Sequence, residues 1–318
     1  LAVVGGILSM YGLWQAIARL PVGIAADWLG QRKPFLIAGF ALSGIGAWVM
    51  VSGSGAAPLT AGRAITGLAA ATWVPLVVLF SSYFPPEKTV YATSLLWLVN
   101  SLSRMLATGL TGWLNAWGGY RLAFLLAMGA AGVAILVTLP IRETNRERKR
   151  PSPRAIGTLI TRPDVLFPAL LSAVAQYVSW SSTFGFLPIL ARNLGASGEM
   201  QSLLVSLSLG AGMVGALITT LVARKVGNLR TLLLSFGIML TGLCVAAAAS
   251  SLGWIMAAQG LIGIGGGIAF PLCMGLSIER VSEAERATAM GLHQAVYATG
   301  MFAGPWLSGI LADWMGIQ

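Results

Sequence analysis

Long apolar runs alternate with short polar segments along the whole chain. A helix needs about 20 mostly apolar residues to cross the roughly 30 Å hydrocarbon core of a bilayer. Ten runs come close to this length, at residues 3–25, 34–51, 59–80, 90–114, 122–139, 165–191, 200–223, 231–249, 252–278 and 288–312. The pattern predicts an all-α polytopic membrane protein with ten transmembrane helices.

The longest polar segment covers residues 141–164 and divides the predicted spans into two groups of five. We expect an N-terminal bundle over residues 1–140 and a C-terminal bundle over residues 165–318, joined by this linker. The linker is rich in arginine between Arg142 and Arg154. Its cations are typical of a solvated connector, and binding of anionic lipid head groups is the alternative use for them.

The positive residues are distributed unevenly between the two sides of the predicted membrane. Fifteen of the 20 Lys and Arg residues fall in loops on the side of the linker, whereas Arg121 and Arg192 fall on the other side. Arg19, Arg63 and Arg104 lie within spans. Because Lys and Arg are enriched in cytoplasmic loops, we place linker 141–164 in the cytoplasm, both chain ends outside, and the protein in the plasma (inner) membrane.

Composition narrows the function classes. The chain is 56% hydrophobic and only 9% charged, with a mean hydropathy of +0.80, whereas soluble proteins are about a quarter charged. The net charge of +10 comes from cations in short loops between spans, so we expect no nucleic-acid partner. The sequence shows no ATP-binding signature, metal-ligand cluster or nucleophile–base pattern. We therefore expect neither an enzyme nor a cofactor or metal site.

A polar corner between the first two spans carries the spacing G-x-x-x-D-x-x-G-x-R-K, formed by Gly23, Asp27, Gly30, Arg32 and Lys33. It resembles the signature between the second and third helices of the major facilitator superfamily of secondary transporters. Two positions depart from that signature, because Trp28 and Gln31 stand where the family usually has a basic residue.

The resemblance implies two pseudo-symmetric helical bundles that rock about a site at the middle of the membrane. The ten spans then correspond to family helices two through eleven, with the first and twelfth lacking from this chain. A genuine ten-span protein is the alternative. Weak internal repeats at an offset of about 195 to 197 residues agree with two related halves: Ala25–Gly30 with Val222–Gly227, Gly62–Gly67 with Ala258–Gly263, and Ala92–Gly109 with Ala287–Gly304.

The resemblance also gives the polar corner a role as a conformational latch. Asp27, at the end of the first span, would meet the N-terminus of the last span near Arg286 to Thr288. A carboxylate at a helix N-terminus is stabilising, so this contact would hold the two halves closed on the cytoplasmic side.

Two arginines within spans are candidates for a substrate or ion cavity. Arg63 lies in a segment that resembles the family's fourth-helix pattern, and an arginine in a span costs about 2.5 kcal/mol or more unless it faces a polar partner or cavity. Snorkelling to the interface is the alternative for Arg63. Asn100 and Arg104 share one polar helical face, where they could bind an anionic or carbonyl-bearing group, or bond to neighbouring helices.

The remaining cavity candidates lie in the second half. Gln176 and Thr183 form a polar stripe beside Trp180, which suits an amphipathic solute, although such aromatic spacing also occurs in helix packing. Gln259 aligns with Arg63 in the repeat. His293 and Tyr297 lie one turn apart, and histidine is the readiest proton carrier near neutral pH. Hydrogen bonding between helices is the alternative for His293.

We therefore predict a secondary active transporter that moves a small organic solute by alternating access and works as a monomer in the lipid bilayer, driven by protons or another coupling ion. Proton-coupled efflux of hydrophobic or amphipathic compounds is the leading hypothesis, and it rests on the family resemblance and on the aromatic stripe beside Trp180. Residues 291–309 also resemble the glycine–proline pattern of antiporters in the superfamily, but that pattern belongs to the fifth helix there and falls in the eleventh here, and close helix packing is the alternative for it. Uptake of a small anion or metabolite through Arg63 and Arg104 is the alternative. A membrane receptor or scaffold without transport is the hypothesis from another class.

Overall fold

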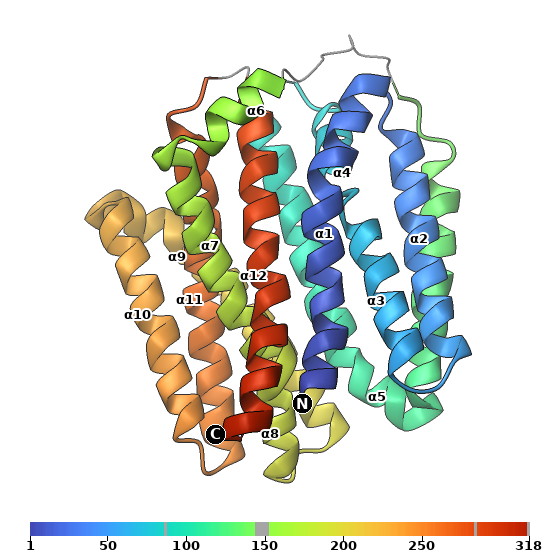
Figure 1. The fold of residues 1–318 in the computed structure, drawn as a ribbon, viewed down its shortest axis with the longest axis vertical. Coiled ribbons are helices and arrows are strands. Elements are labelled where there is room, and N and C mark those ends of the chain that lie inside the picture. The colour runs from blue at the N-terminus through green and yellow to red at the C-terminus, as the bar shows by residue number, and fades with distance from the viewer. Residues whose placement is uncertain (86–87, 144–152, 283–284, 317–318) are drawn as a thin grey trace.

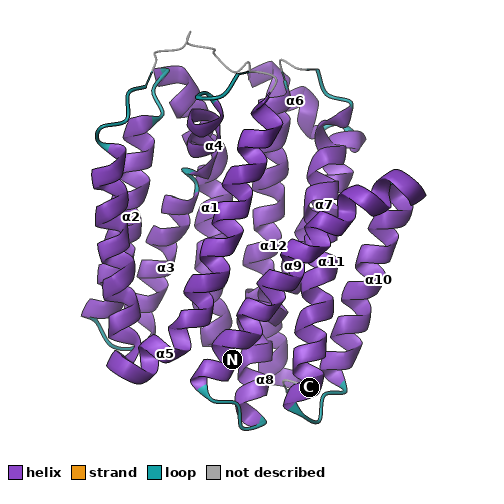
Figure 2. Cartoon of the chain, turned by 180° about the vertical axis from the view of Figure 1, so that it is seen from behind, coloured by secondary structure: helices purple, strands orange, loops and turns teal. Residues whose placement is uncertain are grey.

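A computed structural model describes residues 1–85, 88–143, 153–282 and 285–316. In these ranges every regular element is a helix, and the long helices run side by side along one axis (Figures 1 and 2). The predicted all-helical membrane fold is thereby confirmed. Both chain ends lie at one end of the bundle, which we call the terminal end, and the opposite end, which carries α6, is called the linker end (Figure 1).

The N-terminal half supplies the first five spans. Its helices are α1 (Ala2–Leu29), α2 (Lys33–Ser52), α3 (Ala56–Ala70), α4 (Trp73–Ser81) and α5 (Thr89–Thr138). The helices α3 and α4 together form the predicted span 59–80, with a break at Ala71 and Thr72.

Helix α5 contains two predicted spans because it turns back at Gly118 and Gly119 (Figure 1). Gly119 has a φ of 66°, a conformation that glycine adopts more readily than other residues. Nine segments of the described chain are long and apolar enough to cross a bilayer, and one of them, Ala92–Thr138, is 47 residues long. A helix of about 20 residues already spans about 30 Å, so this segment crosses twice and ten crossings result.

The C-terminal half supplies the other five spans. The predicted span 165–191 is divided into α7 (Pro163–Ser181), a π-helical turn η2 (Ser182–Phe186) and α8 (Leu187–Asn193). It is followed by α9 (Gly198–Val226), α10 (Asn228–Ala247), α11 (Leu252–Glu279) and α12 (Arg286–Met315). Single π-helical turns inside α-helices are frequent at functional sites, and η2 lies beside the candidate site described below.

Part of the predicted linker is itself a helix, α6 (Pro153–Ile160). Leu159 of α6 is only 1% exposed and packs in an apolar cluster with Val165, Val281, Ala289 and Leu292. The C-terminal portion of the linker is therefore fixed to the linker end of the C-terminal half.

The two halves meet along the pairs α1/α12 and α5/α9. Small residues allow the close approach: a Cβ atom on Gly112 of α5 would lie 2.6 Å from the carbonyl oxygen of Gly198, and one on Gly12 of α1 would lie 2.6 Å from the carbonyl carbon of Met301. Packing through glycine is common between transmembrane helices because it brings backbones together. The backbone N–H of Ala2 also donates to Asp313 at 3.0 Å, which joins the halves at the terminal end.

The glycine–proline pattern of α12 has a packing role. A Cβ atom on Gly304 would lie 2.6 Å from the carbonyl oxygen of Tyr177 on α7, so glycine permits the contact between α7 and α12 within the C-terminal half. Close helix packing thus accounts for part of the pattern that suggested an antiporter.

Candidate functional site

The polar corner at the linker end ties α1, α2 and the end of α5 together. Gly30 ends α1 with a φ of 68°, and Asp27 accepts a hydrogen bond from Arg32 at 3.2 Å. Glu143, which sequence reasoning did not select, accepts backbone N–H bonds from Arg32 at 2.7 Å and Lys33 at 2.9 Å. A carboxylate at a helix N-terminus stabilises it, so Glu143 caps α2.

Lys33 completes this corner, because its ammonium group donates to the carbonyl oxygens of Leu139 and Ile141 at 2.5 and 3.0 Å. Gly23 is not needed for close packing here. A Cβ atom at this position would lie 3.5 Å from the side chain of Val74, which is an ordinary contact distance. All of these contacts are within the N-terminal half. The contact between Asp27 and the start of α12 stays a prediction, and in this structure Asp27 pairs with Arg32.

Arg63 lies between the two halves near the middle of the bundle. Its guanidinium carbon is 4.8 Å from the ring centroid of Tyr11 on α1 and 5.8 Å from that of Trp180 on α7. The two rings stack on each other with centroids 5.3 Å apart. The Nε atom of Arg63 is buried and has no hydrogen-bond partner. Arg63 thus presents unused donors beside an aromatic surface built from both halves.

Arg104 of α5 faces the next ring along the same surface. Its guanidinium carbon is 5.5 Å from the ring centroid of Phe184 in η2, and that ring is 5.1 Å from Trp180. Arg104 is exposed, and its ring partner Phe184 is 5.1 Å from Trp180, the ring that Arg63 contacts. Two cations of one half therefore lie over consecutive rings of the other half, with accessible space at Arg104.

A second series of rings begins at Tyr297, the partner of Arg19 of α1. Arg19 donates a hydrogen bond to the hydroxyl of Tyr297 on α12, and its guanidinium carbon is 5.3 Å from that ring's centroid. Tyr297 contacts Phe270 at 5.2 Å between centroids, and Phe270 contacts Trp97 at 5.6 Å. Sequence reasoning left Arg19 out of the site, although the argument applied to Arg63, that an arginine in a span needs a partner, applies equally to it.

The other predicted cavity residues differ in where the structure places them. Asn100 and Gln176 are half-buried, one helical turn before Arg104 and Trp180 respectively. Thr183 is buried in η2 and bonds to Ser208 at 3.2 Å. Gln259 is fully buried, with its amide nitrogen 3.5 Å from the carbonyl oxygen of Thr183. The side chain of Thr183 thus bonds to α9, and that of Gln259 on α11 bonds to η2, both inside the C-terminal half.

His293 is enclosed within the C-terminal half. It is fully buried, its Nε2 atom is 3.1 Å from the hydroxyl of Ser172, and its Nδ1 atom is 2.7 Å from that of Ser277. Both ring nitrogens therefore have serine partners on neighbouring helices. This arrangement favours hydrogen bonding between helices, the alternative to proton carriage, although Tyr297 lies next to the ring at 5.9 Å between centroids.

The electrostatic character of the site follows from the positions of the acidic residues. In the described ranges, the carboxylates lie in loops or near helix ends, at Asp27, Glu143, Asp164, Glu199, Glu279, Glu285 and Asp313. The four ion pairs found there involve the N-terminus, Arg32 and Arg162, but not Arg19, Arg63 or Arg104. The centre of the described bundle is therefore positively charged.

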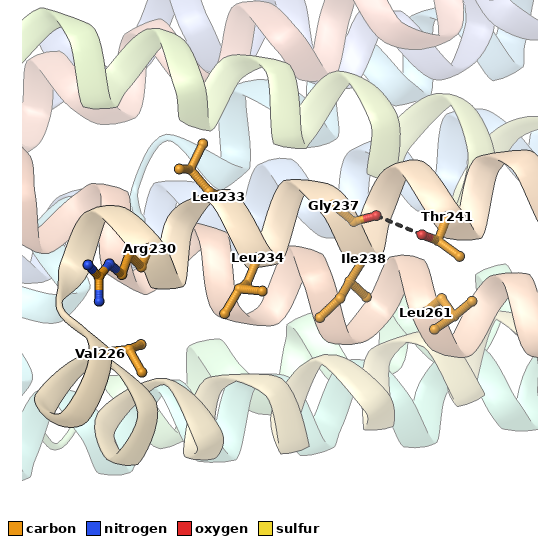
Figure 3. Close-up of a pocket in the computed structure, with 8 residues that line it drawn as sticks. All are labelled: Val226, Arg230, Leu233, Leu234, Gly237, Ile238, Thr241 and Leu261. Atoms are coloured by element: carbon orange, nitrogen blue, oxygen red, sulfur yellow. Dashed lines mark hydrogen bonds between the residues drawn. The ribbon is translucent and has the colours of Figure 1, made fainter.

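A groove of about 690 Å³ elsewhere has a different character (Figure 3). It runs along α10 at the outer edge of the C-terminal half, where Leu233 and Leu234 are 65% and 55% exposed (Figures 1 and 3). Arg230 lies at one end of it, and Thr241 bonds to the carbonyl oxygen of Gly237 at 2.9 Å near the other. Its lining residues come from α9, α10 and α11, so this groove lies within the C-terminal half and not where the two halves meet.

Comparison with known proteins agrees with the fold. The model of the Major Facilitator Superfamily matches residues 1–189 and 169–318. The chain is similar to the solved structure of the nucleoside transporter NupG in a mutant form, with 16% identity, a TM-score of 0.80, and coverage of 100% of this chain and 85% of that one. It is also similar to a bacterial homologue of the human lysosomal transporter Spinster in an inward-facing, unoccupied conformation, with 17% identity, a TM-score of 0.76, and coverage of 99% and 76%.

Proposed function

The chain belongs to the major facilitator superfamily and is a secondary transporter rather than an enzyme, and on this premise we propose that its solute is a small organic anion with an aromatic or other flat apolar body. Arg63 and Arg104 would bind the anionic group, and Tyr11, Trp180 and Phe184 would contact the body. The observation that carries the proposal is that the three arginines within spans have no carboxylate partner in the described bundle, although Arg19 is buried and Arg63 is half-buried.

The energetic argument concerns the two neighbouring cations. An uncompensated charge away from bulk water is costly, and two like charges in proximity add to that cost. The ring faces of Tyr11, Trp180 and Phe184 offset part of it through cation–π contacts. An anion would offset more, because hydrogen bonds from guanidinium groups to carboxylate or phosphate are about twice as strong as neutral ones.

The positive charges of Arg63 and Arg104 disfavour one form of the efflux hypothesis, in which the solutes are lipophilic cations. Efflux of lipophilic cations would bring a third positive charge beside Arg63 and Arg104, which lie on the neighbouring rings of Trp180 and Phe184. Neutral or anionic amphipathic solutes are compatible with the site. The glycine pattern of α12, which resembles that of antiporters, is used in part for packing against α7. We therefore favour the organic-anion alternative for the solute class.

Tryptophan fluorescence of the purified protein tests the solute class directly, since Trp180 lies in the site. We would compare four probes: phenylphosphonate (anion with a ring), methylphosphonate (anion without a ring), benzamide (neutral ring) and tetraphenylphosphonium (cation with rings). We expect phenylphosphonate to change the fluorescence, and methylphosphonate to bind about tenfold more weakly for lack of aromatic contact. The Trp180→Phe variant identifies the part of the signal that comes from Trp180.

Counterflow of phenylphosphonate in proteoliposomes tests transport itself. Arg63→Gln should reduce counterflow by about tenfold or more, because it removes a charge-assisted hydrogen bond worth about 1.5–3 kcal/mol. Arg121→Gln is the matched control, because Arg121 is an exposed arginine beside the turn of α5. Binding and flux of tetraphenylphosphonium with none of phenylphosphonate would contradict the proposal, and binding without any flux would favour a receptor or scaffold.

A further inference from the structure

Arg19 is the most deeply buried of the three arginines within the spans. It is 4% exposed and its Nε atom has no hydrogen-bond partner. Its described contact is with one neutral group, the phenol of Tyr297, which accepts a hydrogen bond and presents its ring. A single neutral acceptor leaves most of the guanidinium donors without a charged partner.

Burial of a cation without a counter-charge is unfavourable, and such residues inside spans mark the paths of substrates or ions. Two buried amides close to Arg19 in the sequence or on the facing helix are also incompletely bonded. Gln15, one turn earlier on α1, and Gln294, three residues before Tyr297 on α12, are 3% and 5% exposed, and each has an amide oxygen without a partner. The paired helices α1 and α12 thus carry three buried side chains, Gln15, Arg19 and Gln294, each with one polar atom that has no partner.

The position of Arg19 relative to the first site follows from α1. Tyr11, which lies under Arg63, precedes Arg19 by eight residues on the same helix, which corresponds to about 12 Å along the axis at 1.5 Å per residue. Since α1 runs from the terminal end to the linker end (Figure 1), Arg19 lies closer to the linker end than the first site does. Tyr11, Trp180 and Tyr297 belong to one continuous hydrophobic cluster.

We infer that Arg19 and Tyr297 form a second anion-binding position, which receives the anionic group of the transported solute on the linker side of Arg63 and Arg104. This inference rests on the proposed function and extends it. The incoming carboxylate, phosphate or phosphonate group replaces the hydroxyl of Tyr297 as acceptor for the Arg19 guanidinium, and the amides of Gln15 and Gln294 can turn to donate to it. The rings of Tyr297 and Phe270 then contact the body of the solute.

The first site at Arg63 and the second position at Arg19 are built in the same way. At each, an arginine of the N-terminal half lies on a ring of the C-terminal half, since Arg63 contacts Trp180 and Arg19 contacts Tyr297. A bound anion at the second position would replace a direct hydrogen bond between the halves by a bridge through the solute. Occupation of the second position is thereby linked to the separation of α1 from α12 at this level.

The test uses two measurements, tryptophan fluorescence and counterflow, with phenylphosphonate as the probe. Both are made on the unaltered protein and on the variants Arg19→Gln and Tyr297→Phe. For Arg19→Gln we expect the fluorescence change from Trp180 to keep its half-saturating concentration within about twofold, while counterflow falls by about tenfold or more for loss of a charge-assisted bond. For Tyr297→Phe we expect the half-saturating concentration for counterflow to fall by about threefold, because no hydroxyl competes with the anion for Arg19.

A purely structural role for the bond between Arg19 and Tyr297 predicts something else. Both variants lose that bond, so both would then lose counterflow alike, and this result would overturn the inference. Unchanged counterflow in Arg19→Gln would overturn it as well. If Arg19→Gln does not fold, as judged by size-exclusion chromatography, the direction of the change in Tyr297→Phe decides. Absence of a fluorescence change in the unaltered protein would instead overturn the proposed function, and this inference with it.

Discussion

Tyr11 of the N-terminal half and Trp180 of the C-terminal half stack with ring centroids 5.3 Å apart and ring planes inclined by 17°. Arg63 lies against both rings, so one stacked pair, drawn from two halves, supports one cation. Any motion that separates the halves at this level also separates the pair. The stack is therefore a contact through which the solute and the conformational change of the transporter can influence each other.

Replacement of Trp180 tests this contact. Trp180→Leu removes the ring under Arg63 and beside Phe184, and cation–π contacts are worth about 0.5–2 kcal/mol. We expect phenylphosphonate counterflow to require a concentration about threefold to thirtyfold higher for half-saturation. Trp180→Phe keeps a ring and should lose less. Equal losses in the two variants would show that volume, rather than the aromatic face, matters at this position.

Asp27→Asn tests the predicted latch. In the state described here Asp27 pairs with Arg32 at the surface, an interaction worth about 0–1 kcal/mol. A contact with the N-terminus of α12 in another state would contribute about 0.3–2 kcal/mol. We expect the variant to increase the population open at the linker end, measured as a longer distance between spin labels on Trp28→Cys and Ser282→Cys in a Cys244→Ala background. A change in preference among the four probes would count against a latch.

Gly112→Ala tests the close approach of α5 and α9. The added Cβ atom would lie 2.6 Å from the carbonyl oxygen of Gly198, so the backbones must move apart. Overpacking of this kind costs about 1–3 kcal/mol, and we expect a lower melting temperature. Gly129→Ala, also in α5, is the control because a Cβ atom there meets nothing within 4 Å. A melting temperature unchanged in both variants would show that α5 and α9 separate freely.

His293→Ala distinguishes a structural histidine from a proton carrier. The change leaves the hydroxyls of Ser172 and Ser277 without this partner, although Ser277 keeps its hydrogen bond to the carbonyl oxygen of Val165 at 3.1 Å. An unsatisfied buried group costs about 1–3 kcal/mol. We expect lower thermal stability, while phenylphosphonate still produces the same change in the fluorescence of Trp180. Unaltered stability with loss of pH-driven flux would instead identify His293 as the carrier.

Much of the architecture could be predicted from local pattern. The ten spans were recognisable because each must contain enough apolar residues to cross the bilayer, whatever its neighbours are. The corner from Gly23 to Lys33 was recognisable because a left-handed glycine and the flanking charges lie within a short stretch. The structure adds what lies far away in the sequence, such as Glu143, whose carboxylate completes the corner more than a hundred residues after Arg32.

The site was predicted only in part, because helical position does not fix a partner. Arg63 and Arg104 could be selected from the cost of a charge within a span. Their ring partners could not, since Tyr11 and Phe184 come from other helices in different halves. His293 and Tyr297 are neighbours on one face of α12, yet His293 bonds inside its own half and Tyr297 bonds to Arg19 across the interface.

The sequence by itself determined the number of membrane crossings and the presence of arginines that need compensation. These properties depend on the hydrophobicity and charge of single segments in a bilayer. Tertiary structure alone decided that three arginines of one half lie on rings of the other half. The physical reason is that the rotation of each helix is set by close glycine contacts between helices, as at Gly12 and Gly112, which no segment specifies alone.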